Sequence, residues 1–305
     1  MSILVELAVG ESPGQISVAD ADAIAAFGGD VGVTGLRLVD RNAERPTIDP
    51  SVVGSFLAGR HGDLGYVIDA PTTHNAPYNL ARRVLSFDRA TAGRVGVVLV
   101  PGNGDEVSDA AIPDVEATDP AERWAEYAEI LTRLWESFPA DALVGDQVSA
   151  VVAEADLIRP IDFDGRFYRV AGPLDGPSSA QGRPVLIAAD PATVGWSRVV
   201  ASADAVIVDR ELIATADAEL SGALDAVGRS RGAVALLARI DGRENASVVR
   251  RWASDLGVDG FVLAVDGGAE EILDVVRDLA PQLAGVAGGT LRAGLGVPVP
   301  SVVPA

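Results

Sequence analysis

The chain has 305 residues, of which 48% are hydrophobic, and its formal net charge at pH 7 is -20. This size and composition suit one large folded core, and the negative charge argues against binding to nucleic acid or to anionic membranes. The sequence contains neither cysteine nor lysine, which excludes disulfides, thiolate chemistry, zinc–thiolate sites and Schiff-base lysines.

The N-terminal segment begins directly with an apolar, β-branched run at Ile3–Val9. It has no basic leader and no small-residue cleavage site, so we interpret it as a strand and not as a signal peptide. No apolar run approaches the roughly 18 residues that a membrane-spanning helix requires. We therefore expect a cytoplasmic protein.

Eight apolar runs of this kind recur along the chain, and a helical pattern follows each one. Such alternation is typical of buried parallel strands joined by crossover helices. Eight units predict an α/β fold, a single (β/α)8 TIM barrel, while a doubly wound open sheet stays the alternative because periodicity does not show closure. The runs are Ile3–Val9, Val33–Val39, Leu64–Ala70, Val95–Val100, Pro184–Ala189, Ala205–Val208, Ala233–Ile240 and Gly260–Val265.

Three predicted helices begin at an Asp-Pro pair, in which the carboxylate caps the helix and the proline fits its first turn. The pairs start at Asp49, Asp119 and Asp190. The helix after Asp119 carries a stripe of aromatic and aliphatic side chains from Trp124 onward, which predicts a face packed against the barrel. The last helix is expected near Ala269–Leu283.

An extended segment, roughly Asp105 to Gly182, separates the fourth and fifth predicted strands. Because it follows a strand, we expect it at the C-terminal face of the barrel, where barrel active sites form. The glycine- and proline-rich stretch after the last helix is expected to run extended over the surface. The predicted organisation is a barrel at residues 1–284 and an extended C-terminal tail at residues 285–305.

Several motifs follow one another in a fixed order between Val33 and Pro298. They include Thr72-Thr73-His74-Asn75-Ala76-Pro77-Tyr78-Asn79-Leu80-Ala81-Arg82-Arg83, then Glu122-Arg123-Trp124-Ala125, then Asp162-Phe163-Asp164-Gly165-Arg166-Phe167-Tyr168 and Gln181-Gly182-Arg183-Pro184. In these motifs the chain resembles the luciferase-like flavin-dependent monooxygenases. The resemblance is widest to their nitrilotriacetate monooxygenase-like branch, of which this chain looks like a shortened member with a divergent flavin site.

This resemblance implies a flavin-dependent oxidoreductase or monooxygenase that acts on a small organic substrate with reduced FMN and oxygen. It also implies a separate flavin reductase as a partner, and a homodimer or a dimer with a paralogue. In such enzymes the cofactor supplies the redox chemistry, whereas the protein shapes the pocket and excludes water.

The resemblance assigns functional roles to four residues that follow the second and third predicted strands. Asp40 matches an acidic residue near the flavin, and Thr72 and Thr73 match paired hydroxyls that contact it. His74 lies where relatives often carry an aromatic residue, and we take it as the candidate catalytic side chain. Each has a plainer alternative: a pair with Arg41 for Asp40, hydrogen bonds to turn backbone for the threonines, and an ordinary loop position for the histidine.

The helix start after the fifth strand resembles the phosphate site of the family, where backbone amides and a hydroxyl bind FMN. Here Asp190 places a carboxylate at that point, Pro191 removes an amide, and Thr193 supplies a neighbouring hydroxyl. We assign Asp190 and Thr193 to the cofactor site and expect FMN binding to be weak or absent. At the fourth strand, Val98 and Pro101 replace side chains that could hydrogen-bond a flavin.

These changes motivate an alternative function, a flavin-free and catalytically inactive barrel that serves as a partner subunit or a binding protein. A third possibility is hydrolytic or lyase chemistry with Mg²⁺ bound by carboxylates at strand ends. Because helix capping explains such carboxylates more simply, we predict no metal site. The carboxylates concerned are Asp40, Asp69, Asp190, Asp209 and Asp266.

Overall fold

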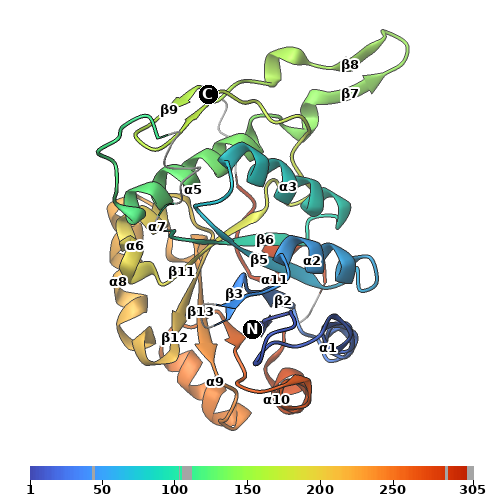
Figure 1. The fold of residues 1–305 in the computed structure, drawn as a ribbon, viewed down its shortest axis with the longest axis vertical. Coiled ribbons are helices and arrows are strands. Elements are labelled where there is room, and N and C mark those ends of the chain that lie inside the picture. The colour runs from blue at the N-terminus through green and yellow to red at the C-terminus, as the bar shows by residue number, and fades with distance from the viewer. Residues whose placement is uncertain (43–44, 103, 105–111, 286–287, 301–305) are drawn as a thin grey trace.

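Eight parallel strands close into a barrel in the order β1-β14-β13-β12-β11-β6-β5-β2, with helices around it (Figure 1). The computed structural model describes residues 1–300 except 43–44, 103, 105–111 and 286–287. Closure confirms the predicted (β/α)8 barrel and excludes the open sheet. The strands are β1 (Ser2–Leu7), β2 (Gly35–Leu38), β5 (Gly65–Pro71), β6 (Val95–Val100), β11 (Val185–Ala189), β12 (Ala205–Asp209), β13 (Ala235–Ile240) and β14 (Gly260–Leu263).

Two of the three predicted Asp-Pro caps form. The Asp49 carboxylate accepts the Ser51 backbone N–H at 2.8 Å, and Asp119 accepts that of Ala121 at 2.9 Å. Among the described residues, no helix has both the length and the apolar character that crossing a bilayer requires. The helices are α1 (Val18–Asp30), α2 (Pro50–Ala58), α3 (Pro77–Ala90), α5 (Pro120–Glu136), α6 (Pro191–Val194), α7 (Trp196–Ser202), α8 (Ile213–Ala226), α9 (Ala246–Asp255), α10 (Ala269–Leu283) and α11 (Leu291–Gly294).

Helix α5 buries its aromatic stripe against the barrel, as its spacing predicts. Trp124, Tyr127 and Trp135 are fully buried. The indole N–H of Trp124 donates to the carbonyl of Leu99 on β6 at 2.8 Å, and that of Trp135 donates to Ala81 on α3 at 2.9 Å. Because each indole finds an acceptor, the rings are buried without an unsatisfied donor.

The extended segment between β6 and β11 contains α5 and two small hairpins. One hairpin, β7–β8, projects away from the barrel (Figure 1). The hydroxyl of Tyr168 donates to the carbonyl of Thr72 at 2.8 Å, which brings the other hairpin to the C-terminal face of the barrel. The short elements are β3 (Arg41–Asn42), β4 (Arg45–Pro46), β7 (Leu143–Asp146), β8 (Val151–Ala153), β9 (Phe163–Asp164) and β10 (Arg169–Val170), with 3-10 turns at Ala140–Ala142, Ala155–Leu157, Arg210–Leu212 and Arg231–Ala233.

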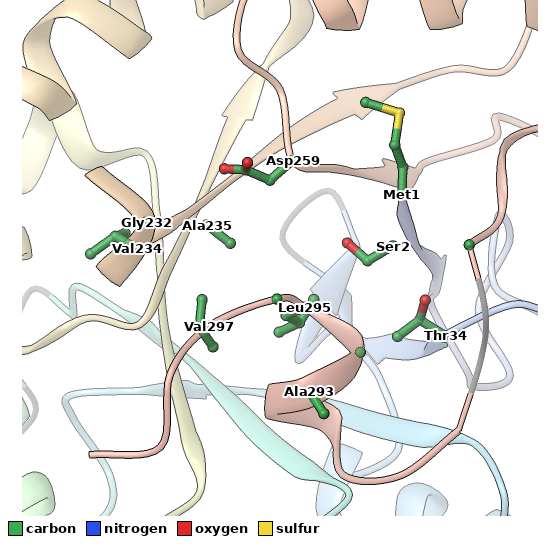
Figure 2. A pocket seen from close by; sticks show the side chains of 13 residues that line it. Met1, Ser2, Thr34, Gly232, Val234, Ala235, Asp259, Ala293, Leu295 and Val297 are labelled. Carbon is green, nitrogen blue, oxygen red and sulfur yellow. The ribbon is translucent and has the colours of Figure 1, made fainter. Parts of the chain in front are cut away.

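Helix α11 fills the N-terminal end of the barrel. A Cβ atom at Gly65 or Gly96 would lie 2.8 or 3.0 Å from the Leu291 side chain, so these glycines leave the space that Leu291 occupies. Leu295 is also buried there. A cavity of about 250 Å³ lies beside α11, and Figure 2 shows Ser2 and Leu295 in its wall.

A buried ion cluster ties this floor to the barrel. The Asp204 carboxylate accepts two hydrogen bonds from Arg183, at 2.9 and 3.1 Å, and two from Arg292, both at 3.0 Å. The backbone N–H of Leu186 on β11 donates to it at 2.9 Å. Burial favours neutral Asp204, but the two guanidinium groups outweigh burial and lower the pKa of this carboxyl.

Candidate active site

Charged side chains line the inner wall of the barrel near the C-terminal ends of five strands. Arg37 Nε and Nη2 donate to the two carboxylate oxygens of Asp69, both at 2.9 Å, and Nη1 donates to Glu6 at 2.8 Å. Arg239 Nη2 donates to Glu6 at 2.8 Å, and Arg239 Nη1 lies 3.4 Å from Asp209. We call these five residues the mouth network.

Ion pairing keeps Arg37 and Glu6 charged against the effect of burial, whereas burial raises the pKa of Asp69 despite its pair with Arg37. The Arg37 side chain is only 8% exposed, and burial opposes its charge, but Asp69 and Glu6 outweigh burial and raise its pKa. Burial likewise favours neutral Glu6, yet Arg37 and Arg239 together lower the pKa of Glu6. The Arg239 side chain is 42% exposed, so it presents the network to solvent.

Three clefts open at the mouth and meet at Arg239. We call the one between β11, β12 and α6 to α8 the Trp196 cleft; its volume is about 570 Å³. In its wall, the indole N–H of Trp196 donates to Glu219 at 2.7 Å. Nine carboxylates and five guanidinium groups line the three clefts together, which leaves a formal charge of -4. The wall of the Trp196 cleft includes Arg37, Ala189, Asp190, Trp196, Glu219 and Arg239.

Asp40 and His74 lie at the rim of the mouth. Asp40 is half-buried, and burial raises the pKa of its carboxyl despite the positive charge of Arg41, whose Nε is 4.0 Å away. His74 is exposed and has a φ of 62°, which is uncommon outside glycine and often marks functional turns. A protonated His74 would oppose burial at Asp40 less strongly than Arg41 does, and a catalytic role for His74 stays a prediction.

Thr72 and Thr73 are buried in the turn after β5. The Thr72 hydroxyl accepts the backbone N–H of Gly102 at 2.9 Å. A Cβ atom at Gly102 would lie 2.3 Å from Thr73 Oγ1, so the Gly102 backbone packs directly on Thr73. These contacts agree with the plainer alternative, in which the hydroxyls order the turn, and a role in flavin binding stays a prediction.

The prediction that the Asp190 carboxylate caps the next helix is wrong. Asp190 has a φ of 50°, and its side chain makes no capping hydrogen bond. A capping residue normally has an extended backbone that directs its side chain at the first-turn amides, and the left-handed turn prevents this. The Thr193 hydroxyl donates to Asp190 at 2.5 Å instead. The helix α6 ends after one turn, and α7 begins at Trp196.

Sequence reasoning missed several site residues, among them Trp196 and Glu219, and most notably the buried Glu6 and Arg37. Each of these last two lies one position before the end of its strand: Glu6 stands between a valine and a leucine in β1, and Arg37 stands between two leucines in β2. Alternate residues of a barrel strand face inward, and a charged side chain at an inward position must find a partner there. A single charge inside an apolar run was therefore the available signal.

Carboxylates at the strand ends do not assemble into a metal site. Within the described ranges, no group of three or more histidine, aspartate or glutamate side chains is arranged to hold a metal ion. Asp69 and Asp209 are paired with arginines of the mouth network, which compete with any cation. The geometry therefore gives the Mg²⁺ alternative no support.

Comparison with known proteins identifies relatives in sequence. A family model described as luciferase-like monooxygenase matches residues 1–240. Nitrilotriacetate monooxygenase component A from Aminobacter aminovorans is 28% identical over 217 residues, which cover 69% of this chain and 48% of that protein. A pristinamycin IIA synthase component from Streptomyces pristinaespiralis is 27% identical over 252 residues, 83% of this chain and 78% of that protein. The chain thus spans about half the length of the first of these relatives.

Solved structures share the barrel fold. A long-chain alkane monooxygenase has a TM-score of 0.82 at 17% identity, covering 97% of this chain and 95% of that chain. A riboflavin lyase, solved with modified FMN and its substrate riboflavin, has a TM-score of 0.79 at 18% identity, with the same coverage of 97% and 95%. At this identity the likeness shows the fold alone, and function must be argued from the site.

Proposed function

The chain belongs to the luciferase-like monooxygenase family, and from this premise we propose a flavin-dependent oxidoreductase that oxygenates a small organic substrate at the barrel mouth. The observation that carries the proposal is the mouth network, whose buried members Arg37, Asp69 and Glu6 lie under the open Trp196 cleft of about 570 Å³. Barrel enzymes hold their active sites at this face. A bound reduced flavin would supply electrons for the reaction with oxygen, and we propose that a separate reductase delivers it.

The residues of this chain would position ligands and move protons. Ala189 and Trp196 give the cleft an apolar wall, while the paired Glu6 and Arg37 form a floor whose polar groups are already oriented. At the rim, Asp40 has a raised pKa, so we propose that it exchanges protons with a ligand while His74 acts as the catalytic partner.

The flavin-dependent function is tested by titrating the purified protein with riboflavin and with FMN and measuring quenching of flavin fluorescence. We expect a dissociation constant in the micromolar range for at least one of them. Ala189→Trp should abolish binding because the indole would fill the Trp196 cleft, whereas Ala226→Trp, at the exposed end of α8, should leave binding unchanged. No binding of either flavin up to about 1 mM, weaker than roughly -4 kcal/mol, would favour the flavin-free partner subunit or binding protein.

We also propose that the protein forms a homodimer through the outer face of α2. Val52 and Phe56 on this helix are 61% and 48% exposed, which is unusual for neighbouring large apolar side chains on a monomer. Phe56→Asp should convert the dimer to a monomer in size-exclusion chromatography with light scattering. Val148→Asp, at a still more exposed apolar position on the β7–β8 hairpin, should leave the dimer intact. A monomeric parent protein would contradict the proposal.

A further inference from the structure

We infer that the barrel mouth binds riboflavin, a flavin without phosphate, in preference to FMN. This inference rests on the proposed flavin-dependent function and adds the charge class of the cofactor. It rests on the summed charge of the mouth and on the carboxylates that line the Trp196 cleft.

The arginines of the mouth are already neutralised. Five of them line the three clefts, and each has a carboxylate partner within 4.0 Å. Arg210 is the one of these five with a buried donor that has no partner, its Nη1 atom, and its Cζ lies 4.2 Å from the centroid of the Trp252 ring. The segments outside the described ranges contain no arginine, and the chain has no lysine. A bound phosphate would therefore have to share a guanidinium whose charge a carboxylate already balances.

Two carboxylates in the wall of the Trp196 cleft have only neutral hydrogen-bond donors. Asp190 accepts the Thr193 hydroxyl, and Glu219 accepts the Trp196 indole N–H. Neither donor cancels a negative charge, so both carboxylates repel a phosphate that itself carries about -1.5 to -2 at pH 7. Because both carboxylates line the cleft itself, salt screens the repulsion of a ligand bound beside them only in part.

The same carboxylates suit the rest of a flavin. A carboxylate accepts hydrogen bonds and donates none, so the hydroxyl groups of the ribityl chain can donate to Asp190 and Glu219, whereas phosphate oxygens cannot. The uncharged isoalloxazine ring finds an aromatic neighbour in Trp196 and an apolar one in Ala189. The chemistry of the cleft therefore favours the uncharged flavin and disfavours its phosphate ester.

The inference is tested by isothermal titration calorimetry of the whole protein with oxidised riboflavin and FMN, at low and at high salt. At low salt, riboflavin should bind about tenfold more tightly than FMN, because the phosphate of FMN is repelled by clefts with a net negative charge. Added salt should strengthen FMN binding and leave riboflavin binding unchanged. FMN binding as tight as riboflavin binding would overturn the inference alone, whereas no binding of either flavin would overturn the proposed function as well.

Charge-removing variants assign the effect to the cleft. Asp190→Asn and Glu219→Gln should each raise FMN affinity severalfold at low salt while changing riboflavin affinity little, because an amide oxygen still accepts a hydrogen bond. Asp225→Asn removes the same charge at the far, exposed end of α8 and should change neither affinity. If Asp190→Asn and Asp225→Asn raised FMN affinity equally, FMN binding would respond to the net charge of the protein alone, and the carboxylates of the cleft would have no special role.

Discussion

Replacing Asp204 with asparagine should lower the free energy of unfolding by about 3–5 kcal/mol, the range for breaking a buried ion pair. The Asp204 side chain is 4% exposed and receives two hydrogen bonds each from Arg183 and Arg292. Asparagine has nearly the same shape, but it leaves the Arg292 guanidinium, 1% exposed, without a carboxylate. The asparagine amide would also direct its own N–H donors at the guanidinium N–H donors of Arg183 or Arg292. Denaturant unfolding of the two proteins measures the difference.

The pH dependence of this variant separates a charge effect from a packing effect. The pKa of Asp204 is lowered in the folded protein. The ionised carboxylate therefore stabilises the fold fully above the ordinary carboxyl pKa of about 4, and this stabilisation is lost as pH falls through the lower folded pKa. The gap between parent and variant should therefore narrow in acid. Asp274→Asn, which breaks an exposed pair with Arg277, should cost less than about 1 kcal/mol. If the difference in the free energy of unfolding between parent and variant did not change with pH, the loss would come from altered packing and not from the lost charge.

Much of the fold could be predicted from sequence because barrel strands are buried on both faces. Such strands appear as continuous apolar runs, and the stripe on α5 and the bounds of α10 follow equally from spacing. The filling of the barrel floor could not be foreseen in this way. It depends on Gly65 and Gly96, whose missing side chains leave the space for Leu291. Residues so far apart in sequence form no local sequence pattern that would predict their contact.

The site was only partly predictable for the same reason. Sequence position placed Asp40, Thr72, Thr73 and His74 near the mouth, because the ends of parallel strands meet there. It could not show the left-handed backbone at Asp190, which depends on how the chain turns out of β11 and which cancels the expected cap. The pairing of charges across the barrel was equally hidden, since partners on different strands become neighbours only when the sheet closes.

Replacing Arg37 with methionine should lower the free energy of unfolding at neutral pH by about 3–5 kcal/mol, because it leaves Asp69 without its counter-charge and Glu6 with Arg239 alone. Arg37 makes two hydrogen bonds to Asp69 and one to Glu6, and each carboxylate is largely buried. Methionine fills similar volume without charge, so packing changes little. The same variant should weaken flavin binding, since the floor of the Trp196 cleft loses its fixed polar groups.

Acid should reduce the cost of the Arg37 substitution. Burial raises the pKa of Asp69 even with Arg37 present, and removing Arg37 takes away the charge that opposes burial, so the folded variant favours neutral Asp69 still more. A carboxyl with a raised folded pKa loses stability as pH rises through its unfolded pKa of about 4 toward the folded value. The deficit measured by denaturant unfolding should therefore be larger at pH 7 than at pH 4. Arg243→Met, whose side chain is 74% exposed beside Asp241, should cost less than about 1 kcal/mol at either pH. An equal deficit for Arg37→Met at both pH values would show that the network does not hold buried charge, and the mouth would then lack the polar floor on which the proposed site is built.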